Sequence, residues 1–245
     1  MEVHAHTHTE RKKWFHYLWE FLMLFLAVFC GFLAENFREH KIEKDREKQY
    51  IRSFVEDLGA DINSLGERIN YCTFTQKLAD STIGLLTRKD RDTVAKDIYH
   101  FLRQLHRSDL FTVNDRTIIQ LRNAGGMRMI SDKAVSDSMM DYYKQVDFIR
   151  FIFEESTEFR HSLRTYFPML LDGVEYRKFE NEEFRDMPVK GQVKLLSADP
   201  EVINTILITL NHIDGINEVI NHLLNNLRKK ARGIREFILK KYNLS

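Results

Sequence analysis

Three alternating histidines near the start of the chain are its clearest candidates for metal chemistry. They are His4, His6 and His8. Neutral imidazoles on a flexible tail can chelate Zn, Ni or Cu. A structural or catalytic metal site also needs fixed geometry and hydrogen bonds that orient its ligands, which a terminal tail does not supply. We therefore expect adventitious metal binding or none, and no bound cofactor.

A carboxylate stands at the start of the longest apolar segment. Residues 21–34 carry no charge, and Glu20 directly precedes them. An ionisable group inside a membrane span is a candidate for a proton path or for pairing between helices. Near the membrane boundary, the same carboxylate can instead reach lipid headgroups or His16, one helical turn earlier. The sequence favours this second interpretation.

Motifs of the common catalytic sites do not occur in the sequence. There is no glycine-rich phosphate loop, zinc-protease motif or nucleophile elbow. Gly125-Gly126 lacks the neighbouring Lys and Ser/Thr of a phosphate loop, and a helix C-cap explains it. The remaining histidines are scattered, and no acid, base and nucleophile can be named together. We expect a protein that is not an enzyme, and we identify no small-molecule substrate.

Composition indicates long helices. The 245 residues include 37 Lys plus Arg and 36 Asp plus Glu, for a net charge of +1. This balance argues against a nucleic-acid partner bound by bulk electrostatics. Only 10 Gly and 3 Pro disfavour a turn-rich sandwich or barrel. The mean hydropathy of −0.40 is that of a soluble protein, but it averages over one strongly apolar segment.

That segment predicts a transmembrane helix over 14–34. Its twenty-one residues are long enough, at about 1.5 Å each, to cross roughly 30 Å of hydrocarbon. Trp14, Tyr17 and Trp19 are aromatic residues of the kind that favours the membrane interface. A cleaved signal peptide is disfavoured because a bulky Phe stands three residues before each suitable cut. A buried soluble helix remains the alternative.

The flanking charges predict the orientation of this span. Arg11, Lys12 and Lys13 precede it directly, which favours a cytoplasmic tail over 1–13. The following segment, 35–50, is charged nearly all round and predicts a solvated stalk helix. Its five basic residues alternate with five acids, so the basic count alone does not decide the orientation. We expect the main domain, 51–245, outside the cytoplasm.

The rest of the chain predicts an all-α fold. An apolar seam with alternating four- and three-residue spacing begins at Ile51, and Gly59 and Gly66 weaken that helix without breaking it. Further helices are expected over 92–107, from an Asn114 N-cap to Gly125-Gly126, and from Ser131-Asp132 to Pro168. An irregular connection, 168–198, then includes a possible hairpin between Val174 and Leu196.

The last helix has the clearest signals. Asp199 suits its N-cap, Pro200 its first turn, and Glu201 the positive end of its dipole. A heptad seam then runs through Ile206, Leu210, Ile213, Asn217, Ile220, Leu224, Leu227, Ala231, Ile234 and Ile238. Asn217 either specifies register and oligomeric state or is a polar residue tolerated within a bundle. The sequence predicts an antiparallel bundle of long, coiled-coil-like helices.

Two segments carry a family resemblance. In residues 19–58 the matching features are Glu20, Asn36 and the run from Tyr50-Ile51 to Glu56-Asp57-Leu58. In residues 117–143 they are Leu121, Ala124, Gly125, Ile130, Asp132, Tyr142 and Tyr143. The chain thus resembles an uncharacterised family of small bacterial single-pass membrane proteins. The resemblance implies an anchor and a helical domain but no activity.

We expect a membrane-anchored helical scaffold or assembly subunit. The expected location is the bacterial inner membrane, with the N-terminus cytoplasmic and the bundle periplasmic. The expected partners are the lipid bilayer and either further copies of the chain or another membrane protein. The alternative is an extracytoplasmic sensor or ligand-binding module that signals through a partner.

Overall fold

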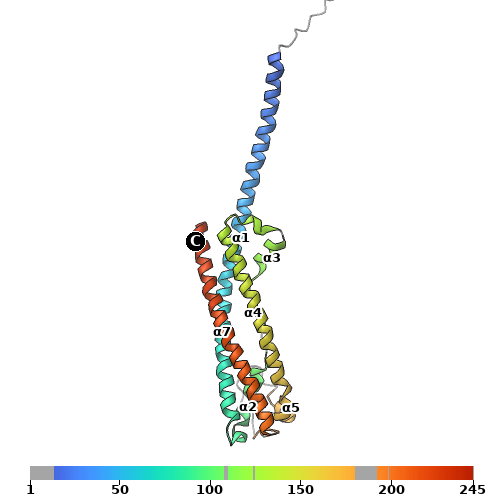
Figure 1. Ribbon diagram of the computed structural model, residues 1–245, viewed down its shortest axis with the longest axis vertical. Coiled ribbons are helices and arrows are strands. Elements are labelled where there is room, and N and C mark those ends of the chain that lie inside the picture. Colours follow the sequence, from blue (N-terminus) through green and yellow to red (C-terminus); the bar gives the residue numbers. More distant parts are fainter. Residues whose placement is uncertain (1–13, 108–109, 124, 180–191, 198, 245) are drawn as a thin grey trace, which may run out of the picture. The chain divides into compact units, whose positions relative to one another are not determined.

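The computed structural model describes residues 14–107, 110–123, 125–179, 192–197 and 199–244 (Figure 1). Its regular elements in these ranges are helical, and one isolated bridge joins Leu171 to Leu195. The all-α prediction is therefore confirmed. The elements are α1 (Trp14–Leu86), η1 (Arg91–Val94), α2 (Ala95–Leu105), α3 (Arg116–Asn123), η2 (Gly126–Met129), α4 (Lys133–Thr165), α5 (Phe167–Leu170), α6 (Gly173–Arg177) and α7 (Pro200–Tyr242).

The chain divides into two compact units between Tyr50 and Ile51, although α1 runs through the boundary as one helix. In the first unit, every side chain from Trp14 to Phe32 is exposed. An 18-residue window there has a mean hydropathy of 2.0, and none of it is buried within the chain. This part of α1 is long and apolar enough to cross a membrane. It could serve as an anchor, and a signal sequence has the same properties.

The second unit is built on three long helices: the part of α1 after Tyr50, α4 and α7 (Figure 1). Side-chain contacts fix their directions. Asp61 and Arg68 of α1 meet Tyr142 and Phe153 of α4, so these two helices run in parallel. On α7 the order reverses: Asn221 contacts Thr73, and the later residue Arg228 contacts the earlier residue Ile62, so α7 is antiparallel to α1.

Helix α7 is also antiparallel to α4, because Asn217 contacts Arg160 while Lys230 contacts Asp141.

The predicted seams form the core of this bundle. All ten seam positions of α7 from Ile206 to Ile238 are buried. On α1 the seam is buried at most positions and half-buried at Ile62, Ile69 and Ile83. At the end of the bundle where α1 finishes, α2 and α5 pack with α1, α4 and α7 in one hydrophobic cluster. Its members include Ala79, Leu86, Ile98, Tyr99, Leu102, Leu163, Leu170, Ile206 and Leu210.

Several predicted helix ends are confirmed. Asp199 accepts a hydrogen bond from the Glu201 amide at 2.9 Å, and Pro200 is the first residue of α7. Asp132 caps α4 by accepting from the Val135 amide at 3.1 Å. Gly125 has a φ of 64°, the left-handed conformation that favours glycine after a helix.

Asn114 is not the N-cap of the next helix, contrary to the prediction. α3 begins at Arg116, and the Asp115 carbonyl accepts from the Ile119 amide at 3.0 Å. The Asn114 side chain instead donates to Asp61, which lies far away in the sequence. A tertiary acceptor has therefore replaced the local capping interaction.

The connection after α4 also differs from the prediction. α4 ends at Thr165, and Pro168 lies in the first turn of the short helix α5. Val174 is part of another short helix, α6, whose first amides donate to the Asp172 carboxylate at 2.8 and 3.0 Å. The predicted hairpin is therefore wrong at its first strand. Residues 180–191 lie outside the described residues.

Candidate functional site

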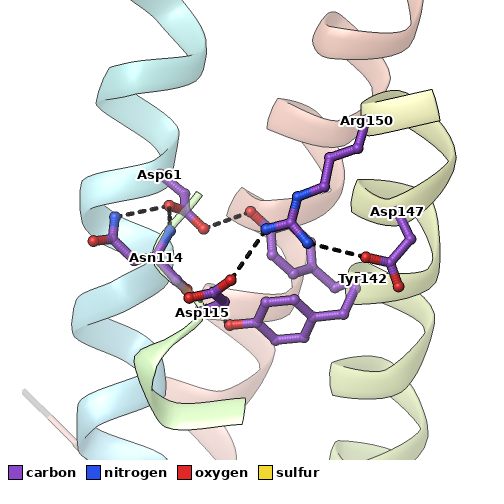
Figure 2. A network of polar contacts seen from close by, with 7 residues as sticks. Asp61, Asn114, Asp115, Tyr142, Asp147 and Arg150 are labelled. Carbon is purple, nitrogen blue, oxygen red and sulfur yellow. Dashed lines mark hydrogen bonds and ion pairs between the residues drawn. The ribbon is translucent and has the colours of Figure 1, made fainter. Parts of the chain in front are cut away.

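Two carboxylates of α1 are buried in the bundle. Asp57 and Asp61 stand one helical turn apart, and they are 5% and 0% exposed. A charge at such depth is costly unless hydrogen bonds replace the lost water. The segment 110–123 and helix α4 supply these bonds, and Figure 2 shows the part of the network around Asp61.

Asp61 joins three parts of the chain. Its Oδ1 accepts from the backbone N–H of Asn114 at 2.7 Å and from the side-chain Nδ2 of Asn114 at 2.8 Å. Its Oδ2 accepts from the Tyr142 hydroxyl at 2.7 Å (Figure 2). Burial raises the pKa of Asp61, and the hydrogen bonds from Asn114 and Tyr142 oppose that rise.

Asp57 caps a helix to which it does not belong. Its Oδ2 accepts from the Thr117 hydroxyl and, at 3.2 Å, from the Thr117 amide in the first turn of α3. Its Oδ1 accepts from Arg116 Nη2 at 3.3 Å. Free amides and the helix dipole favour a negative charge at this position. A carboxylate of α1 therefore fixes the start of α3.

Two tyrosines complete the cluster from α4. The Tyr143 hydroxyl donates to the Asn114 carbonyl at 2.9 Å, while Tyr142 donates to Asp61. Both rings pack on Phe54, at centroid distances of 6.4 Å for Tyr142 and 6.1 Å for Tyr143. Burial is the largest influence raising the pKa of both hydroxyls. At neutral pH they are therefore hydrogen-bond donors.

Ion pairs lie at the edge of the same cluster. Arg150 of α4 contacts Asp115 with Nη2 and Asp147 with Nη1, both at 3.1 Å (Figure 2). These side chains are more exposed than Asp57 and Asp61, so solvent weakens their attraction. We name the set Asp57, Asp61, Asn114, Thr117, Tyr142 and Tyr143 the polar clamp, because it holds α1, α3 and α4 together.

The polar clamp is a set of hydrogen bonds between helices. Both Asp57 and Asp61 accept hydrogen bonds from neighbouring backbone and hydroxyl groups, and Tyr142 and Tyr143 stay protonated at neutral pH because burial raises the pKa of their hydroxyls. Across the described ranges, no group of three His, Cys, Asp or Glu side chains is placed to hold a metal ion. The hydroxyls of Thr117 and Tyr142 donate to the buried carboxylates of Asp57 and Asp61, and these bonds hold the helices in position.

A second buried polar contact involves Asn217 of α7. It is 1% exposed within a single chain, and its Oδ1 accepts from Arg160 Nη2 at 3.0 Å. Arg160 Nη1 also donates to the Leu105 carbonyl at 2.8 Å, at the end of α2. Asn217 thus lies in the interior of the chain's own bundle, where it fixes α7 against α4.

Sequence reasoning did not single out Arg160 or Asp61. Arg160 follows Ser156 by four residues and precedes Leu163 by three, and all three are on the buried side of α4. A charged residue at such a position was the available signal. The signal for Asp61 was weaker: it lies one turn after Asp57, on the buried side of α1.

The predicted membrane residues all lie on the first unit of α1. His16 Nε2 and Glu20 Oε1 are 3.2 Å apart, so the predicted reach of Glu20 to His16 is present. Trp14, Tyr17 and Trp19 are exposed near the beginning of the helix. The histidines His4, His6 and His8 lie outside the described residues, and metal binding by them stays a prediction.

The two segments that carry the family resemblance meet in the polar clamp. Asp57 belongs to the first segment, and Thr117, Tyr142 and Tyr143 belong to the second. No family model, curated protein or solved structure matches this chain. The resemblance therefore stays a prediction.

Proposed function

We propose that this protein is a single-pass, membrane-anchored helical scaffold or assembly subunit without enzymatic activity. The observation that carries the proposal is the continuity of α1, which begins as an exposed apolar helix and contributes one of the three long helices of the bundle. Its exposed residues suit a hydrocarbon environment. The proposed location is the bacterial inner membrane, with the N-terminus in the cytoplasm and the bundle in the periplasm.

The polar clamp and the Arg160–Asn217 contact support a structural role. Both use buried polar groups to fix how the helices pair, and neither presents a reactive group to solvent. Buried polar contacts of this kind favour one arrangement of helices over its alternatives. A defined, rigid surface is what an assembly subunit needs.

Purification of the full chain in a mild detergent, followed by mass spectrometry, tests the scaffold function. We expect the chain to elute as an oligomer or with a membrane protein partner in reproducible stoichiometry. A strictly monomeric chain without a co-purifying protein would contradict the proposal. A reporter fused to the C-terminus, active only in the periplasm, tests the orientation separately.

A sensor or ligand-binding module is the second candidate, and it rests on one small cavity. Ser64, Glu67, Arg68 and Tyr71 of α1 line a cavity of about 230 Å³ together with Phe111 and Thr112. It is smaller than the roughly 300–1,000 Å³ of most ligand sites. A small ligand that raises the melting temperature of the wild type, but not of an Arg68→Ala variant, would favour this function over the scaffold.

A further inference from the structure

The apolar part of α1 has one face with ionisable side chains. His16 and Glu20 lie one turn apart on it, and their side chains are 54% and 52% exposed. They are therefore directed away from the helix axis into the surroundings. The residues lining the groove along this face are His16, Trp19, Glu20, Met23, Leu24 and Ala27.

The opposite face is aromatic. Phe21, Phe25 and Phe29 follow one another at four-residue spacing, and their rings stack at centroid distances of 6.3 and 5.9 Å. At about 100° per residue, Phe25 and Phe29 lie roughly 140–180° around the helix from Glu20 and Ala27, while Phe21 lies roughly 100–120° from them. The helix thus has one bulky, wholly apolar face and one face that carries an acid and a base.

These two faces differ in what they tolerate within a bilayer. Stacked phenylalanines can contact lipid chains at no cost in lost hydrogen bonds. An ionisable pair is expensive against lipid, and such residues generally face other helices or water-filled cavities. We therefore expect protein rather than lipid on the face of His16 and Glu20.

We propose that this face is covered by the same face of a second copy of the chain, an inference that rests on the proposed membrane anchor. Two copies inserted in the same direction are parallel, so their His16 and Glu20 side chains lie at the same depth. Each imidazole then comes within about a turn of the other copy's carboxylate. The face is complementary to itself because it carries both partners of the ion pair.

The ionisable side chains of each copy are already partnered. His16 Nε2 and Glu20 Oε1 lie 3.2 Å apart within one chain, and a partnered acid and base are less costly to bury than either alone. Further along the same face, no described side chain or neighbouring helix lies within 4 Å of where a Cβ of Gly31 would be, so two backbones can approach there.

Cysteine cross-linking in native membranes tests the proposal on the full chain. In a Cys30→Ser background, single cysteines replace Ala27 or Gly31 on the proposed face, and Phe25 or Phe29 on the opposite face. The background chain without a new cysteine controls for Cys72, which is buried in the bundle. After mild oxidation, we expect at least fivefold more disulfide-linked dimer from Ala27→Cys and Gly31→Cys. Equal yields, or a higher yield from the Phe positions, would overturn the proposal.

Substitution of Glu20 tests the role of the ionisable pair. In the Ala27→Cys chain we expect Glu20→Leu to lower the dimer yield several-fold, and Glu20→Gln to lower it less because the amide still forms hydrogen bonds. An undiminished yield with leucine would refute the role of the carboxylate. A cross-link from Ala27→Cys to a different protein would refute the second copy as the partner.

Alkaline carbonate extraction of the same membranes separates the two proposals. Wild type that leaves the membrane would contradict the anchor itself. Chains that stay in the membrane without face-specific cross-links would contradict only the pairing.

Discussion

The guanidinium group of Arg228 lies directly over Gly66. A Cβ added at Gly66 would be 2.7 Å from Nη2 of Arg228, while Nε of Arg228 donates to the Ile62 carbonyl at 2.9 Å. One heptad away the contact is looser, because an added Cβ at Gly59 would lie at an ordinary van der Waals distance of 3.6 Å from Nε of Arg235. Gly66 therefore makes room for Arg228, while Gly59 does not have to be glycine for Arg235 to fit.

We predict that Gly66→Ala gains less stability than alanine normally brings to a helix, because the guanidinium group of Arg228 must move. The new methyl group displaces Arg228 and costs its hydrogen bond to Ile62. The matched control is Gly84→Ala on the same helix, where no described atom outside the adjoining turns of α1 lies within 4 Å of the added Cβ. That control should raise the free energy of unfolding by about 0.5–1 kcal/mol. Denaturant unfolding of the detergent-solubilised chain, followed by circular dichroism, measures both.

The displacement of Arg228 can be isolated with a double variant. In an Arg228→Ala background the clash is absent, so Gly66→Ala should stabilise the chain as Gly84→Ala does. A Gly66→Ala variant that is as stable as Gly84→Ala in the wild-type background would show that Arg228 does not require the glycine.

The sequence predicts only part of the effect of Gly59 and Gly66. Propensity alone predicts that Gly59 and Gly66 weaken α1, and this is a local effect. The packing role of Gly66 depends on Arg228, more than 160 positions later, which no local pattern reveals. The start of α7 was predictable because Asp199, Pro200 and Glu201 act on neighbouring amides. Asn114 was misassigned for the converse reason, since its partner Asp61 is remote.

The Arg160–Asn217 contact gives a second prediction. Asn217→Leu removes one acceptor from a buried guanidinium, so we expect a loss of about 1–3 kcal/mol in the free energy of unfolding. The double variant Arg160→Met, Asn217→Leu should recover much of this loss, because it removes the buried charge together with its partner. Chemical denaturation of the four chains measures the coupling energy. Additive losses would show that the two residues act independently.

The polar clamp predicts a dependence of stability on pH. Burial raises the pKa of Asp61, so the folded chain binds a proton at this carboxyl group at pH values where the unfolded chain has released it. The contribution of Asp61 to stability is therefore greatest below its ordinary pKa. It falls as the pH rises through the folded-state pKa.

The matched variant is Asp61→Asn, which keeps an acceptor for Asn114 and does not titrate. Its stability relative to the wild type should increase between pH 4 and pH 7, by at most about 1.4 kcal/mol per pH unit. Thermal unfolding at several pH values measures this difference. A difference that is constant with pH, or that decreases, would contradict a raised pKa.

Asp57 gives a local prediction. Asp57→Ala removes the cap of α3, and we expect a loss of about 1–2 kcal/mol. Hydrogen exchange should accelerate in residues 116–123 more than in α7. Asp57→Asn, which keeps an acceptor oxygen, serves as the control and should have a smaller effect. Uniform acceleration along the whole bundle would show that Asp57 does not act specifically on α3.

Alkaline carbonate extraction followed by flotation is the most direct test of the central proposal, that α1 anchors the chain in a membrane. We predict that the full chain stays with the floating membranes, and that a variant with Leu24, Ala27 and Val28 all replaced by Asp does not, because charges at these positions prevent insertion. Recovery of the wild-type chain in the soluble fraction would contradict the account.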